Sequence, residues 1–202
     1  TAALIDEQYA RAAASLITST HGWINFVSAI LAKAPRNVIL PPKKAESGLP
    51  GQRSSSGVFE LPPNRAAVVT LTRSPARYQS MQIGDLWFNA LDYTQRQTSL
   101  TMAQARASSD GRYRLVICAQ DPGVPNWLDT GGASTVFAFL RWQGLHGSYE
   151  IPQSDFPKTT VVDFDAIRSE FPADEPHFGP DERAEQLAAR RASALRSPRG
   201  FR

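Results

Sequence analysis

Between Gly57 and Phe164 the chain repeats one pattern, a short run of β-branched and aromatic residues followed by a group of turn residues. The runs are GVFEL, AAVVTLT, RYQSMQIGDLW, GRYRLVICA, STVFAFLRW and KTTVVDF. Their composition is typical of β-strands, and the Pro, Gly, Asn, Asp and Ser residues between them mark strand ends. No regular helical pattern separates each pair of runs, which favours an antiparallel sheet. We therefore expect a mainly β fold with flanking helices, built as an antiparallel jelly-roll-like β-sandwich.

Two of these runs also predict where their strands lie in the sheet. The run 111–119 alternates apolar and basic residues at its start, which is typical of a strand with one exposed face. The run 134–142 is apolar on both faces up to Arg141. A strand that is apolar on both faces is usually covered on both sides, so we expect this run to be central.

Helical patterns lie at both ends of the chain. Apolar residues recur at three- and four-residue spacing through 2–33, and STHG at 19–22 interrupts them, which predicts a helical hairpin. Near the other end, DFDAIRSEF predicts a short helix. GPDERAEQLAARRASALR predicts a longer one that begins at Pro180, with acidic residues in its first turn and arginines in its last. The thin apolar side of this helix indicates a position on a surface or on a partner.

The predicted organisation has four parts. Residues 41–57, PPKKAESGLPGQRSSSG, are rich in Pro, Gly and Ser and contain almost no apolar residue, which is typical of a flexible loop. The length of 202 residues suits one domain with a buried core. We expect an N-terminal helical hairpin over 1–40, the flexible loop over 41–57, a β-sandwich over 58–163 and a C-terminal helical extension over 164–202.

Composition narrows the classes of partner and cofactor. The net charge is only +3, and the arginines near the C-terminus do not alternate with aromatic residues, so we expect no nucleic-acid partner. No apolar run is long enough to predict a membrane span. A single cysteine, Cys118, excludes an intrachain disulfide, and its run RLVICA predicts a buried, inert thiol. The three histidines lack ligand spacing, so we expect neither a metal site nor a cofactor.

The first residue bears on the surroundings of the chain. The sequence begins at Thr1 rather than at a methionine, so we expect an upstream N-terminal region or a partner chain. The compartment stays unknown, although a single cysteine and the lack of a visible signal peptide favour the cytoplasm.

The densest group of polar side chains lies in QDPGVPNWLDTGG, residues 120–132. Its prolines and glycines stiffen the segment, which leaves Asn126, Trp127 and Asp129 displayed on a braced loop. Asp121 and Asp129 could act as a carboxylate pair in acid/base chemistry or, helped by the Asn126 amide oxygen, bind a hard cation. Alternatively, both aspartates bond backbone amides at turns and Trp127 fills the core. The sequence leaves both alternatives open.

A second polar motif, LDYTQRQTSL, places Asp92 and Arg96 four residues apart. Arg96 could bind a carboxylate or phosphate group of a ligand through paired N–H groups. It could instead form an ion pair with Asp92 that holds a crossing loop. The aromatic rings of Trp87, Trp127, Trp142 and Tyr93 could form a flat stacking surface, or they could belong to the core.

Three segments, ARYQSMQIGDLWFNALDYTQRQTSL, DGRYRLVICAQDPGVPNWLDTGG and FLRWQG, resemble the bacterial family catalogued as domain of unknown function 1214. The resemblance covers residues 57–145, and QDPGVPNWLDTGG is its most specific motif. The ending DERAEQLAARRA is similar to actinobacterial members. The resemblance implies a β-sandwich C-terminal module that often follows a further N-terminal region, and it implies no activity. Many relatives carry a histidine directly after the double glycine, where this chain has Ala133-Ser134.

Two functions fit these observations. The first is a module that binds a small ligand or packs on a partner region, and its candidate binding residues are Arg96, Asn126, Trp127, Tyr93 and Trp87. The alternative is a hydrolase or lyase in which Arg96 anchors an anionic substrate group. The candidate catalytic residues are Asp121, Asp129 and Asp92. A cleft shared by Asp92, Arg96, Asn126 and Asp129 would favour the enzyme, whereas saturation of these groups by backbone hydrogen bonds would weigh against it. We expect the binding module.

Overall fold

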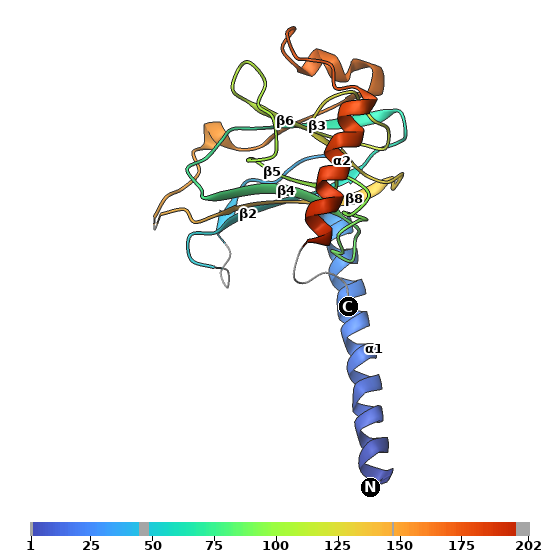
Figure 1. Cartoon of the computed structure of the whole chain (residues 1–202). Coiled ribbons are helices and arrows are strands. Elements are labelled where there is room, and N and C mark those ends of the chain that lie inside the picture. Colours follow the sequence, from blue (N-terminus) through green and yellow to red (C-terminus); the bar gives the residue numbers. More distant parts are fainter. Residues whose placement is uncertain (1, 45–48, 147, 197–202) are drawn as a thin grey trace. The chain divides into compact units, whose positions relative to one another are not determined.

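The computed structural model describes residues 2–44, 49–146 and 148–196, and the chain divides into two compact units, 1–34 and 35–202 (Figure 1). The α-helices are α1 (Ala2–Lys33) and α2 (Pro180–Leu195), and the 3-10 helices are η1 (Gln153–Asp155) and η2 (Phe164–Glu170). The strands are β1 (Lys43–Lys44), β2 (Arg53–Glu60), β3 (Arg65–Leu71), β4 (Tyr78–Gly84), β5 (Ser99–Thr101), β6 (Tyr113–Cys118), β7 (Trp127–Asp129), β8 (Thr135–Gln143) and β9 (Lys158–Asp163).

The first unit is one unbroken helix, α1, so the predicted hairpin is wrong. The segment STHG at 19–22 continues the helix instead of ending it. Gly22 costs a helix interior only about 1 kcal/mol relative to alanine, and the alanine-rich turns before it favour helix. The helix ends just before Pro35, because the residue that precedes a proline is disfavoured in helical conformation. The first unit accordingly ends at Ala34 instead of the predicted position 40.

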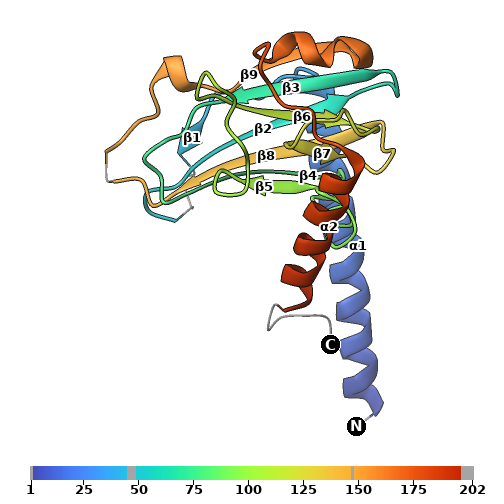
Figure 2. The same cartoon turned by 45° about the horizontal axis from the view of Figure 1, so that its top comes forward.

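The second unit contains two sheets that lie one above the other (Figure 2). The five-stranded sheet has the order β1-β2-β8-β4-β5, and the four-stranded sheet has the order β7-β6-β3-β9. Among the strands of the described residues, every pairing is antiparallel except that of β6 with β7, which is parallel. Strand β8 is central, as its two apolar faces predicted. The mainly β fold with flanking helices is therefore confirmed.

The main hydrophobic core lies between the sheets. The five-stranded sheet contributes Phe59, Leu140 and Trp142, and the four-stranded sheet contributes Val69 and Ile117, all of them fully buried. Because side chains alternate along a strand, each sheet also has an outer face that points away from this core.

A second apolar cluster covers the outer face of the four-stranded sheet. Val68 and Val116 of the sheet pack there with Ile167 of η2, the short helix that the sequence predicts. Arg114, on the face that was expected to be exposed, donates a hydrogen bond from Nε to the Glu170 carbonyl at 2.6 Å. The face is thus closed by a helical segment and by an arginine that bonds to it.

Residues 41–57 are not simply the predicted flexible loop, because they supply β1 and most of β2. The serine-rich stretch of β2 pairs with β8, with Ser55 opposite Leu140. Backbone pairing requires no apolar side chain, so the polar composition concealed the first half of this strand, whereas the run GVFEL predicted its second half. The buried guanidinium of Arg53 binds the Glu150 carboxylate at 2.7 Å. Residues 45–48 of the predicted loop lie outside the described residues.

Helix α2 begins at Pro180, as predicted, and Glu182 Oε2 accepts a hydrogen bond from the Gly179 N–H at 2.7 Å. This arrangement caps the helix N-terminus. Residues 197–202 of the predicted extension lie outside the described residues. Among the helices of the described chain, none combines the length and apolar character needed to cross a bilayer.

Candidate functional site

The side chain of Asp121 is held by an arginine of α2. Arg183 donates from Nε to Asp121 Oδ2 at 2.9 Å and from Nη2 to Asp121 Oδ1 at 3.0 Å, and Asp121 Oδ1 also accepts from the Gly123 N–H at 2.9 Å. Arg183 is buried and bonds the carbonyls of Val124 and Pro125 as well. This bidentate pair fixes the first half of the 120–132 loop to α2.

Asp129 is held by a different arginine. Arg96 donates to Asp129 Oδ2 at 2.8 Å, and Asp129 Oδ1 accepts from the Gly131 N–H at 2.7 Å. The predicted ion pair between Asp92 and Arg96 is therefore wrong. Asp92 instead accepts hydrogen bonds from the Thr94 hydroxyl and from backbone N–H groups. These bonds lower the pKa of Asp92, and the bond from the Thr94 hydroxyl has the largest effect.

Asn126 and Trp127 are buried structural residues. The amide group of Asn126 spans the backbone of Arg106, since Oδ1 accepts from its N–H at 2.8 Å and Nδ2 donates to its carbonyl at 2.7 Å. Trp127 donates from Nε1 to the Cys118 carbonyl at 3.0 Å, and the Arg183 guanidinium lies over its ring. Both side chains face other parts of the protein, which matches the structural alternative in the sequence analysis.

The candidate carboxylates thus act as acceptors for arginines and backbone N–H groups. Asp121 and Asp129 each hold their own arginine, so neither is arranged with the other as a carboxylate pair around a cation. Across the described residues, no group of three or more His, Cys, Asp or Glu side chains could hold a metal ion. Burial raises the pKa of the Cys118 thiol to about 12, which keeps it protonated near neutral pH.

The remaining aromatic candidates, Trp87 and Tyr93, are exposed, with 52% and 40% of their surface accessible. Both lie on the connection between β4 and β5. The connection begins with a tight turn in which the Asp85 carboxylate accepts hydrogen bonds from the N–H groups of Trp87 and Asn89 at 2.8 and 2.9 Å. The side chain of Asp85 therefore fixes the turn that presents Phe88.

Beside this turn, the outer face of the five-stranded sheet forms an aromatic groove of about 170 Å³. We define the aromatic groove by the residues that line it, Gln82, Gly84, Phe88, Phe137, Phe139 and Arg141. Phe88 stacks on Phe137 with ring centroids 4.1 Å apart, and the Arg141 guanidinium lies 5.0 Å from the Phe139 ring centroid. The groove thus combines ring surfaces with Arg141. No hydrogen bond or ion pair joins the Arg141 guanidinium to the described part of the chain.

The backbone at Phe88 is strained. Its φ angle is +62°, in the left-handed region, which a bulky residue adopts only at a cost of about 1–2 kcal/mol. The Phe88 N–H donates to the Asp85 carbonyl at 3.0 Å, so the turn enforces this conformation. Strain of this kind concentrates at functional sites, where the surrounding structure holds a side chain in place.

Sequence reasoning missed the aromatic groove, although one signal for it was present. The run 134–142 is apolar on both faces, and Phe137 and Phe139 occupy the face opposite to the core. We interpreted the double apolar face only as a sign of a central strand. It also indicates that the outer face carries rings that pack, bind a ligand or contact a partner.

Comparison with known proteins finds a similar fold and assigns no function. No family model matches the chain, and no curated protein matches it either. It is similar to the solved structure of an uncharacterised protein from Burkholderia cenocepacia, with a TM-score of 0.60 and 24% identity over 72% of this chain and 39% of that chain. A Vibrio parahaemolyticus protein gives a TM-score of 0.41 and 19% identity over 55% of this chain and 31% of its own. The chain thus spans about two fifths of the Burkholderia protein, and the matched part of this chain has the same fold as that portion.

Proposed function

We propose that this chain is a binding module that holds a small aromatic acid in the aromatic groove. The observation that carries the proposal is the strained backbone of Phe88, which keeps its ring stacked on Phe137 at the edge of the groove. A strained conformation persists only where neighbouring structure maintains it, and the Asp85 turn does so here. The ring is thereby preorganised, which lowers the entropic cost of binding a flat ligand.

The size of the aromatic groove supports a ligand with one ring. Its volume is about 170 Å³. An engineered apolar cavity of about 150 Å³ is enough to bind benzene. The groove is therefore suited to a single six-membered ring, which would stack on the phenylalanine side chains in an offset or edge-to-face arrangement.

The charge of the aromatic groove supports a ligand that carries an anionic group. Arg141 is exposed at the groove and lies over the Phe139 ring. Its guanidinium can donate two parallel hydrogen bonds to a carboxylate. Gln82 adds an amide group on the same wall. A benzoate-like molecule would meet the rings with its apolar body and Arg141 with its carboxylate.

The alternative function, a hydrolase or lyase, has less support. Its acid/base candidates, Asp121 and Asp129, each accept hydrogen bonds from a backbone N–H and from an arginine. The oxygens of both carboxylates are thus occupied by donors of the fold itself, so neither carboxylate is turned toward a substrate.

We also propose the finer features that the sequence suggests. The two packed sheets would form a jelly-roll-like β-sandwich, and the chain would be the C-terminal module of a member of the domain of unknown function 1214 family. The motifs within residues 57–145 support this family. A further region or partner chain would cover α1, which exposes more than half of the surface of Leu4, Ile5, Tyr9, Leu16 and Ile17.

The test of the binding proposal is a titration of the ¹⁵N-labelled chain with benzoate, followed by amide chemical shifts. We expect saturable shifts at β4 and β8 with a dissociation constant near 1 mM, which corresponds to about −4 kcal/mol. Phe139→Ala and Arg141→Gln should each weaken binding about tenfold.

The matched control is Arg112→Gln, which removes an exposed arginine directly before β6 and should leave benzoate binding unchanged. Benzyl alcohol, which keeps the ring and lacks the charge, should bind the parent about tenfold more weakly than benzoate. Benzoate shifts confined to residues 120–132 would contradict the proposal and return the site to the loop that the sequence predicts.

A further inference from the structure

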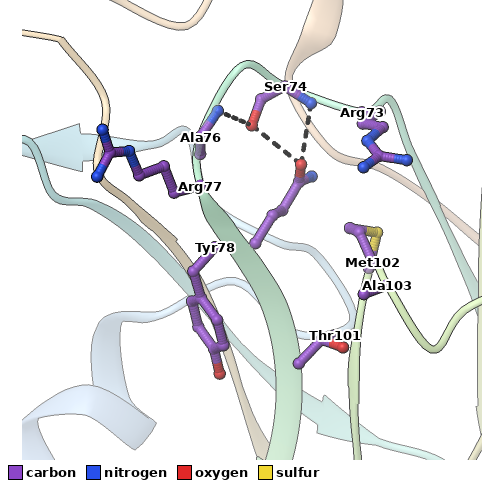
Figure 3. Close-up of a pocket in the computed structure, with 9 residues that line it drawn as sticks. Arg73, Ser74, Ala76, Arg77, Tyr78, Thr101, Met102 and Ala103 are labelled. Carbon is purple, nitrogen blue, oxygen red and sulfur yellow. Dashed lines mark hydrogen bonds between the residues drawn. The ribbon is translucent and has the colours of Figure 1, made fainter.

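A second cavity, of about 300 Å³, lies where the turn between β3 and β4 meets the turn that follows β5 (Figure 3). We call it the arginine cavity, and its lining residues are Arg73, Ser74, Ala76, Arg77, Tyr78, Gln79, Thr101, Met102 and Ala103. These described lining residues include two arginines and no acidic residue. The cavity shares no lining residue with the aromatic groove.

The turn that carries both arginines is fixed from inside the protein. Gln79 is buried, and its Oε1 accepts hydrogen bonds from the Ser74 N–H and hydroxyl, both at 3.0 Å. Gln79 Nε2 donates to the Thr72 carbonyl at 2.9 Å, and Ser74 Oγ accepts from the Ala76 N–H at 3.3 Å. One buried amide thus determines the backbone positions from which both arginines leave the turn.

Neither guanidinium group is paired within the described structure. Arg73 and Arg77 are exposed, and no hydrogen bond or ion pair joins either guanidinium to a described residue. Elsewhere, Arg53, Arg114 and Arg183 each hold a carboxylate. Two unneutralised guanidinium groups beside one cavity leave a local excess of positive charge that attracts anions.

The positions of the two side chains indicate the shape of the anion. Figure 3 shows Arg73 and Arg77 leaving the turn on opposite sides of Ser74. The stem of Arg77 packs against Gly144, where an added Cβ would lie 3.1–3.2 Å from three of its carbons. A compact anion would meet one guanidinium, whereas an anion with charges at both ends would meet both. The volume suits a molecule of about ten non-hydrogen atoms.

We propose that the arginine cavity binds a small ligand with two anionic groups, one held by Arg73 and the other by Arg77. Each guanidinium presents a planar set of donors that matches a phosphate or carboxylate group. The turn presents both arginines before the ligand arrives, so binding requires ordering of the side chains and little change of the backbone. This site is independent of the aromatic groove and of its ligand.

The test uses pyrophosphate and inorganic phosphate as probes, measured by isothermal titration calorimetry with the full chain in about 50 mM salt. We expect pyrophosphate to bind at least tenfold more tightly than phosphate. Arg73→Gln and Arg77→Gln should each weaken pyrophosphate binding about tenfold and bring its affinity close to that of phosphate. Both residues are exposed, so the melting temperatures should stay at the parent value and exclude misfolding.

Arg112→Gln is the matched control, because it removes the same charge from an exposed position directly before β6. It should change pyrophosphate affinity less than twofold. Equal weakening by all three substitutions would overturn the proposal, since it would mean that only the overall charge attracts the anion. Equal affinity for phosphate and pyrophosphate in the parent would overturn the requirement for two anionic groups.

Discussion

The 120–132 loop and the aromatic groove differ in how available their side chains are. In the loop, Asp121, Asn126 and Asp129 are fully engaged by an arginine or by backbone groups. In the aromatic groove, the Arg141 guanidinium lies over a ring, and Phe88 sits on a strained backbone. The more polar region is the structural one. Polar residues in a stiff loop indicate hydrogen bonds that must be made, and availability depends on what the rest of the fold supplies.

Arg183 holds the 120–132 loop more firmly than Arg96 does. Its loss should therefore have the largest effect on stability. Arg183→Ala would leave Asp121 and the Val124 and Pro125 carbonyls without their donor and would empty the space between the Trp127 and Phe178 rings. Breaking a buried pair costs about 3–5 kcal/mol. For a chain of this size we expect the melting temperature to fall by about 10 °C, measured by circular dichroism.

Arg191→Ala is the control for this substitution, because Arg191 is exposed on the same helix. It should change the melting temperature by less than about 2 °C. A similar loss in both variants would mean that helix propensity, and not the contact with the loop, sets the stability.

The second largest effect is expected at Asp129. Asp129→Ala removes the partner of the Gly131 N–H and of Arg96, which should destabilise the chain by about 2 kcal/mol. Cys118 offers a local readout, since burial raises its pKa to about 12 and it reacts only when the structure opens. Iodoacetamide labelling at pH 8 should be about tenfold or more faster in the variant.

The opposite result at Asp129 would reverse the comparison. Unchanged labelling together with an unchanged or raised melting temperature would mean that the carboxylate is held at a cost to stability. Asp129 would then regain its place as a functional candidate, and the loop would be the site.

In the aromatic groove, we expect a smaller effect on stability from substitutions of Phe88. Phe88→Ala and Phe88→Gly both remove the ring, but only alanine keeps the strain of a left-handed backbone at φ +62°. We expect the glycine variant to be about 1 kcal/mol more stable than the alanine variant in urea unfolding. Neither variant should retain the benzoate affinity of the parent. A more stable alanine variant would show that the turn is not strained.

The smallest effect is expected from a surface ion pair, Asp110 with Arg114. Hydrogen bonds from Arg114 lower the pKa of Asp110 from 3.8 to about 2. A carboxyl group with a lowered pKa stabilises the fold above its unfolded pKa, and that contribution is lost as the pH falls through its folded pKa. The stability difference between the parent and Asp110→Asn should therefore shrink between pH 4 and pH 2. It should be small, because the pair is partly exposed.

Asp165→Asn is the control for the pH experiment, since Asp165 is exposed on η2. This control measures how much an Asp→Asn substitution at an exposed position without an ion pair in the described structure changes stability over the same pH range. A difference for Asp110→Asn that does not change with pH would mean that the Arg114 pair contributes nothing to folding.

The strands could be predicted from the sequence because their signals are local. Alternating or continuous apolar runs bounded by turn residues gave the positions of β3, β6, β8 and β9. The exceptions have local causes too. Gly22 was too weak a break to end α1. The serines hid the first half of β2, which pairs with β8 through its backbone.

The candidate site could not be predicted, because it depends on contacts between distant residues. Asp121 is paired with Arg183, 62 positions away, so its availability was hidden from the sequence. Similarly, Phe137 and Phe139 stand on the outer face of β8, and only the fold distinguishes that face from the core. Residue type indicated where chemistry could occur, whereas tertiary contacts decided which groups were left for it.

The parallel pairing of β6 with β7 limits how the chain can change in length. Val116 lies opposite Trp127 and Cys118 opposite Asp129, so the chain returns to run in the same direction after only Ala119–Asn126. Parallel neighbours usually need a connection of a dozen or more residues. An insertion or deletion of one residue in this segment would shift the register of β7 and exchange its faces, so that Leu128 would leave the core. We expect this segment to tolerate substitutions more readily than any change in its number of residues.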